Sequence, residues 1–91
     1  MNLEKGIVLL DFYSDQCHPC KLLMADLEEL SNEFSDITIH KVNIMDSYDL
    51  TEKYQIRSVP TLVMLKDSAS TASYTGYKGK EDLKKFLKDN T

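Results

Sequence analysis

The chain contains two cysteines, Cys17 and Cys20, which stand three residues apart in a sequence of 91 residues. The entropic stabilisation from a disulfide grows with the length of the loop that it closes, so such a close pair adds little to the stability of a fold. In a reducing compartment, cysteines at this spacing are typical of redox catalysis or of metal binding. The spacing therefore indicates chemistry at the sulfur atoms, of one of these two kinds.

Metal binding would need more ligands than the pair itself supplies, because a closed zinc site takes four. The chain has two histidines, His18 and His40. His18 lies between the cysteines, where it cannot easily share their metal, and a histidine on a strand such as His40 is more often structural or exposed. We therefore expect no metal and no other cofactor in a single chain, although a metal bridged between two chains stays open.

The residues around the pair predict a helix that begins at the cysteines. Gly6 precedes the continuous apolar run Ile7–Tyr13, which is typical of a strand buried on both faces. Pro19 suits the first turn of a helix, where its missing N–H is not needed. Apolar residues then recur at helical spacing, namely Leu23, Leu27, Leu30 and Phe34.

This placement predicts different roles for the two sulfurs. Unpaired N–H groups and the helix dipole at a helix N-terminus favour negative charge, which lowers the pKa of a thiol there. Cys17 is therefore predicted to be the nucleophile. Cys20 lies one turn later on the same face, where it can attack the Cys17 sulfur and resolve a mixed disulfide.

The remaining pattern predicts one α/β domain over residues 1–91. Strands are expected at residues 37–43, 61–65 and 70–77, a short helix after Asp46 or Ser47 through Tyr54, and a last helix opened by residues 79–82. The order β-α-β-α-β-β-α implies a parallel pair with a right-handed crossover and an antiparallel hairpin. We therefore predict a four-stranded mixed sheet with helices on both faces.

Charge and hydropathy exclude several classes of function. The formal net charge of −4 argues against nucleic acid, whose binding depends on neutralising phosphates. The longest apolar stretch, residues 7–10, is far shorter than the roughly 20 residues of a membrane span. The N-terminus lacks the pattern of a signal peptide. We expect a cytoplasmic protein that binds neither nucleic acid nor membrane.

Three motifs resemble the thioredoxin family, in the family's order and over residues 7–90. Residues 11–21, DFYSDQCHPCK, are similar to the family signature DFWAxWCGPCK. Residues 41–44, KVNI, resemble the family's strand into its next helix, and residues 54–62, YQIRSVPTL, are close to YGIRGIPTL. The family's leading strand and helix have no counterpart in the first six residues, so the resemblance implies the minimal thioredoxin fold.

The resemblance also implies an activity and partners. Such proteins reduce disulfides in oxidised proteins, such as ribonucleotide reductase or peroxidases, and are recycled by thioredoxin reductase or a similar electron donor. We expect a monomer of this kind. A glutaredoxin-like enzyme, an oxidising or isomerising disulfide enzyme, and a non-enzymatic binding subunit with the same fold remain alternatives.

Two residues match the family's proton-transfer group. Asp11 matches the buried aspartate behind the cysteines; burial is expected to raise its pKa, which would let it act as the base that deprotonates Cys20. Lys41 matches the lysine near that aspartate and would adjust the pKa of Asp11. The alternative for Lys41 is an exposed lysine at the end of a strand.

Three further residues match the family's substrate-docking surface. Pro60 matches its cis-proline, and the backbone at Val59 would pair with the extended chain of the substrate. Gly76 matches a glycine where a side chain would block that approach. The alternatives are a trans turn proline at Pro60 and an ordinary strand glycine at Gly76.

The resemblance implies that Gln16, His18 and Pro19 face the substrate, and the signature departs from the family at Gln16 and His18. The chain has no tryptophan, and Tyr13 and Gln16 occupy the two usual tryptophan positions, so partner choice is expected to differ. His18, as imidazolium, would stabilise the Cys17 thiolate and make the pair more oxidising. The alternative is that His18 is merely an exposed loop residue.

Overall fold

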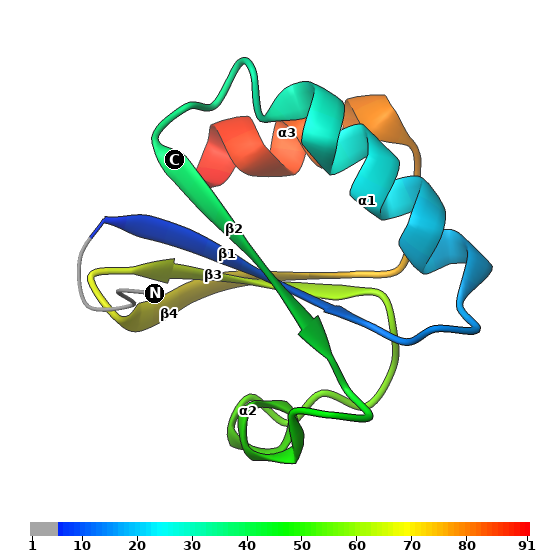
Figure 1. Cartoon of the computed structure of the whole chain (residues 1–91). Helices are drawn as coiled ribbons and strands as arrows, with labels where there is room; N and C mark the ends of the chain where they lie inside the picture. Colours follow the sequence, from blue (N-terminus) through cyan, green and yellow to red (C-terminus); the bar gives the residue numbers. More distant parts are fainter. Residues whose placement is uncertain (1–5) are drawn as a thin grey trace.

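The computed structural model describes residues 6–91, which form one four-stranded sheet and three helices (Figure 1). The elements in chain order are β1 (Ile7–Tyr13), α1 (His18–Leu30), β2 (Ile37–Asn43), α2 (Tyr48–Lys53), β3 (Thr61–Lys66), β4 (Ala69–Thr75) and α3 (Lys80–Asn90). The strand order is β2-β1-β3-β4, with β1 parallel to β2 and antiparallel to β3, and with β3 and β4 antiparallel. The predicted mixed sheet is confirmed.

Helices cover both faces of the sheet, as predicted: α1 and α3 lie on one side and α2 on the other (Figure 1). Side chains of the central strand β1 pack on both faces of the sheet, because successive side chains of a strand point to opposite faces. Its Leu9 packs with the leucines of α1 and α3, while Leu10 and Phe12 pack with the cluster that includes Leu50 of α2. β1 is thereby buried on both faces and fixes the start of the segment that carries the cysteines.

The first helix is shorter than its apolar spacing predicts. α1 ends at Leu30, and Phe34 lies beyond it, although Phe34 still packs against the core below α1 and α3. The hydroxyl of Ser31 donates to the Glu28 carbonyl at 2.7 Å, and the side-chain amide of Asn32 donates to the Glu29 carbonyl at 3.3 Å. The carbonyls of the last turn thereby accept hydrogen bonds from side chains, in place of the N–H groups that a further helical turn would supply.

The hairpin between β3 and β4 also shifts a predicted boundary. Asp67 and Ser68 both have positive φ, 49° and 74°, the backbone that favours a tight two-residue hairpin turn. β4 then begins at Ala69 and ends at Thr75, so the predicted strand over 70–77 is too long at its end. Gly76 consequently lies outside the sheet. No helix in the described part of the chain has the length and apolar character needed to cross a lipid bilayer.

Candidate active site

Cys17 and Cys20 are joined by a disulfide across the first turn of α1, with their Cα atoms 5.2 Å apart. Cys17 is the N-cap residue of the helix, and its Sγ accepts a hydrogen bond from the Cys20 backbone N–H at 3.2 Å. Pro19 occupies the first turn, as predicted. The pair therefore opens the helix at the position where a sulfur anion receives most support from the helix backbone.

The two sulfurs differ in their access to a partner. Cys17 is 9% exposed, whereas Cys20 is 1% exposed. The neighbouring residues Gln16, His18 and Pro19 are all exposed. Cys17 is therefore the more exposed cysteine of the pair, and these three exposed side chains are its neighbours in sequence.

Asp11 is a fully buried carboxyl group on β1. Neither of its carboxylate oxygens has a hydrogen-bond partner, and the residue is 0% exposed. Burial raises the pKa of Asp11 from 3.8 to about 6, while the charge of Lys41 lowers it. Asp11 follows Leu9 by two residues and so faces the α1 side of the sheet, the layer in which Cys20 is also buried. A buried acid without a partner is unfavourable for stability, so its position indicates a chemical role.

Lys41 is the register partner of Asp11 in the parallel pair of β1 and β2. Its ammonium, however, bonds to Glu28 on α1, with Lys41 Nζ 3.3 Å from Glu28 Oε1. Lys41 is exposed, and it acts on Asp11 through its charge and not through a hydrogen bond. Glu28 was not among the residues predicted from the sequence. The only sequence signal for Glu28 was its position in the predicted helix, directly after Leu27, which is buried.

The Val59–Pro60 peptide bond is cis, as the family resemblance implies, so the trans alternative is wrong. Pro60 is buried and Val59 is half-buried. β3 starts just after Pro60, and its Thr61 lies opposite Phe12, near the end of β1. The Val59–Pro60 segment therefore lies at the end of the sheet from which the chain passes into α1 (Figure 1).

Gly76 lies beside Pro60 and not within a strand. Its N–H donates to the Pro60 carbonyl at 2.9 Å, directly after β4 ends. Its φ of +86° favours glycine, and apart from its two chain neighbours no atom of residues 6–91 lies within 4 Å of a Cβ built there. The strand-glycine alternative is wrong, and the space above Gly76 is open to a partner.

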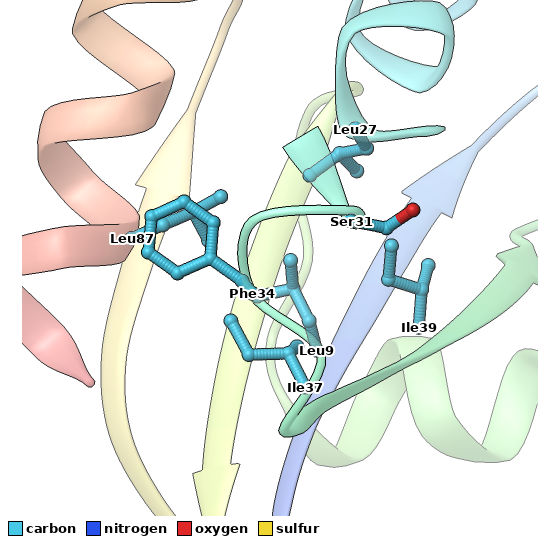
Figure 2. Close-up of a pocket in the computed structure, with 7 residues that line it drawn as sticks. All are labelled: Leu9, Leu27, Ser31, Phe34, Ile37, Ile39 and Leu87. Carbon is cyan, nitrogen blue, oxygen red and sulfur yellow. The ribbon is translucent and has the colours of Figure 1, made fainter. Parts of the chain in front are cut away.

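A small cavity lies away from the cysteines, between the sheet and the ends of α1 and α3. Figure 2 shows its lining, which is almost entirely apolar: Leu9, Leu27, Ser31, Phe34, Ile37, Ile39 and Leu87. At about 10 Å³ it is at the lower limit for one water molecule. It is a gap in core packing and supplies no chemistry. Within residues 6–91, no three His, Cys, Asp or Glu side chains are grouped to hold a metal ion.

A redox-active cysteine pair at a helix N-terminus, with a cis-proline at the same end of the sheet, defines a thiol–disulfide oxidoreductase. The family model described as Thioredoxin matches residues 1–89. The thioredoxin of Chlamydia pneumoniae is 38% identical over 85 residues, 93% of this chain and 83% of that protein. That of Bacillus subtilis (strain 168) is 37% identical over 85 residues, 92% of this chain and 82% of that protein.

A solved structure, that of a mutant thioredoxin from Halobacterium salinarum NRC-1, superposes with a TM-score of 0.85 at 31% identity, covering 96% of this chain and 76% of that one. The chain belongs to the thioredoxin family. It is a protein-disulfide reductase of the dithiol type. Membership implies a reductase as electron donor and disulfide-containing substrates in general.

Proposed function

We propose that the chain reduces disulfides in oxidised proteins, such as ribonucleotide reductase or peroxidases, with electrons from a thioredoxin reductase or a similar donor. The observation that carries the direction of attack is the contrast between Cys17, 9% exposed at the helix N-cap, and Cys20, 1% exposed. The Cys17 thiolate attacks one sulfur of the substrate disulfide, which forms a mixed disulfide and releases one substrate thiolate. The cytoplasmic location and the monomeric state stay predictions from the sequence.

The second step needs a thiolate at Cys20, which is buried away from water. Asp11 supports this step because its raised pKa, about 6, lets a buried carboxylate accept a proton near neutral pH. The Cys20 thiolate then attacks Cys17 Sγ, releases the second substrate thiolate, and leaves the Cys17–Cys20 disulfide. The reductase returns two electrons and two protons to complete the cycle.

Substrate docking is assigned to the backbone around Val59 and Pro60, with Gly76 beside it. The hydrogen bond from Gly76 N–H to the Pro60 carbonyl holds these two segments together. An extended substrate chain can pair with the Val59 backbone in the manner of an added strand. Gln16, His18 and Pro19 form the exposed rim that meets the substrate near Cys17.

The experiment that tests this function compares two electron donors in reduction of insulin disulfides. We expect turnover with NADPH and thioredoxin reductase, and little turnover with glutathione and glutathione reductase. Turnover with glutathione alone would favour the glutaredoxin-like alternative. If insulin were reduced neither with these two donors nor with dithiothreitol, the alternative of a non-enzymatic binding subunit would be favoured.

His18 is expected to make the cysteine pair more oxidising. It stands at the first position of α1, next to Cys17, and is exposed. As imidazolium it stabilises the thiolate and hence the reduced form. We predict that His18→Gly makes the reduction potential more negative, measured by redox titration against glutathione. A potential unchanged within error would show that His18 is an ordinary exposed residue.

Lys41 is expected to set the pH range in which Asp11 accepts protons. Its charge lowers the pKa of Asp11, so Lys41→Met should raise that pKa above about 6. Less carboxylate is then available at pH 6, and mixed-disulfide resolution should slow there by about twofold, with little change at pH 8. Lys53→Met, on α2 at the other face of the sheet, is the matched control. Equal rates for the two variants at pH 6 would contradict this role.

A further inference from the structure

The segment that joins β4 to α3 carries Gly76 and has no regular secondary structure. It is bounded by two glycines with positive φ, Gly76 at 86° and Gly79 at 102°. Glycine adopts such conformations readily and also leaves them readily, so the backbone alone does not fix this segment. The bond from the Gly76 N–H to the Pro60 carbonyl holds the first residue of this segment, so the position of the residues that follow depends on the side chains between the two glycines.

Tyr77 supplies a contact from this segment to the active-site helix. Its hydroxyl donates a hydrogen bond to Asp26 Oδ2 on α1 at 2.5 Å, although the two residues are 51 positions apart in sequence. A hydroxyl bound to a carboxylate at this distance is a charge-assisted hydrogen bond, stronger than a neutral one. The bond raises the pKa of Tyr77, which keeps the hydroxyl protonated as a donor.

The neighbouring contacts of α1 do not reach this segment. They join α1 to α3 itself, pairing Glu29 with Lys80 and Glu33 with Lys84, the latter at 3.1 Å. All four of these side chains are partly exposed, and exposed ion pairs contribute little to stability. Among these side-chain contacts between α1 and the C-terminal part of the chain, the Tyr77 bond is the one that restrains the residues next to Gly76.

We propose that Tyr77 is a positioning residue, whose hydrogen bond to Asp26 fixes the Gly76 segment against α1. The same helix begins at Cys17, and Gly76 is bonded to the carbonyl of Pro60. The contact therefore keeps the backbone that docks the substrate, at Val59 and Pro60, at a fixed distance from Cys17 Sγ, which attacks the substrate disulfide. This inference rests on the proposed function, and it predicts an effect on the binding of protein substrates and none on the sulfur chemistry.

The test compares Tyr77→Phe with Lys84→Met in the full chain. Lys84 Nζ pairs with Glu33 Oε1 at 3.1 Å, so its variant loses a contact between α1 and α3 that does not reach the segment between β4 and α3. Tyr77→Phe should raise KM for insulin about tenfold, which corresponds to about 1.4 kcal/mol, near the lower end of the range for a hydrogen bond to a charged group. Its kcat, and its rate with the small disulfide 5,5′-dithiobis(2-nitrobenzoate), should stay as in the unmodified chain. Lys84→Met should leave all three unchanged.

A KM that changes equally in Tyr77→Phe and Lys84→Met would overturn the proposal, as would an equal loss of rate with the small disulfide. Hydrogen exchange at the Gly76 amide gives a readout that does not depend on activity. Exchange should be faster in Tyr77→Phe than in Lys84→Met, and equal exchange would overturn the proposal. An unmodified chain that fails to reduce insulin would instead overturn the proposed function, while the exchange result still decides the role of Tyr77.

Discussion

Replacing Cys20 with serine is expected to trap partner proteins on Cys17 as stable mixed disulfides. The N-cap position of Cys17 is untouched, so its thiolate still forms and attacks. The group that releases the partner is missing, and multiple turnover should fall by at least about 10³-fold. Intact mass measurement should find one partner per chain, released by dithiothreitol.

The matched variant is Cys17→Ser, which should lose turnover to the same degree without trapping a partner. The double variant should be no worse than either single one, because two residues that act as a unit have non-additive effects. Because Cys20 is 1% exposed, we expect that it does not take over the attack. A partner trapped on Cys20 in Cys17→Ser would reverse the assigned roles, and retained turnover in either variant would refute them.

The strands that lead to this site are the part of the fold that local sequence determines best. β1 and β2 have the predicted bounds, because a glycine-bounded apolar run and a β-branched alternation each indicate a strand without reference to the rest of the chain. The end of α1 was not predictable in this way. Helical spacing continues to Phe34, but the helix stops where the side chains of Ser31 and Asn32 bond to its last carbonyls.

The features of the site also differ in whether a local sequence pattern predicts them. The cysteines and their helix follow from spacing and local pattern, and the cis bond before Pro60 follows only from the family resemblance. The contacts of Glu28 with Lys41 and of Asp26 with Tyr77 join residues far apart in sequence. They depend on how α1 packs against β2 and against the segment after β4, which no local pattern contains.

Asp11 is expected to destabilise the folded protein at the pH where it works. Its pKa is higher in the folded chain, about 6, than the ordinary value of 3.8, so the folded state binds this proton more tightly than the unfolded state. The contribution of Asp11 to the free energy of unfolding is therefore largest below pH 3.8, where the carboxyl is protonated in both states. This contribution is lost as the pH rises through about 6. The difference between the two pKa values corresponds to about 3 kcal/mol.

Asp11→Asn removes the buried charge and keeps the shape of the side chain. The free energy of unfolding of the oxidised variant should exceed that of the unmodified chain by up to about 3 kcal/mol at pH 8, and the two should converge near pH 4. Urea denaturation at the two pH values measures this difference. Asp36→Asn, an exposed aspartate, is the control. Equal stability of Asp11→Asn and the unmodified chain at pH 8 would show that the buried carboxylate carries no penalty.

The same substitution should slow the chemistry that the buried carboxylate serves. Without a proton acceptor near Cys20, resolution of a mixed disulfide on Cys17 should slow by about 10²-fold at pH 7. Alkylation of Cys17 by iodoacetamide should be nearly unchanged, because the thiolate at the helix N-cap does not need Asp11. A variant that is more stable, reacts normally at Cys17 and resolves slowly cannot be explained by misfolding. Normal resolution in that variant would remove Asp11 from the mechanism and leave its unpartnered burial without a chemical reason.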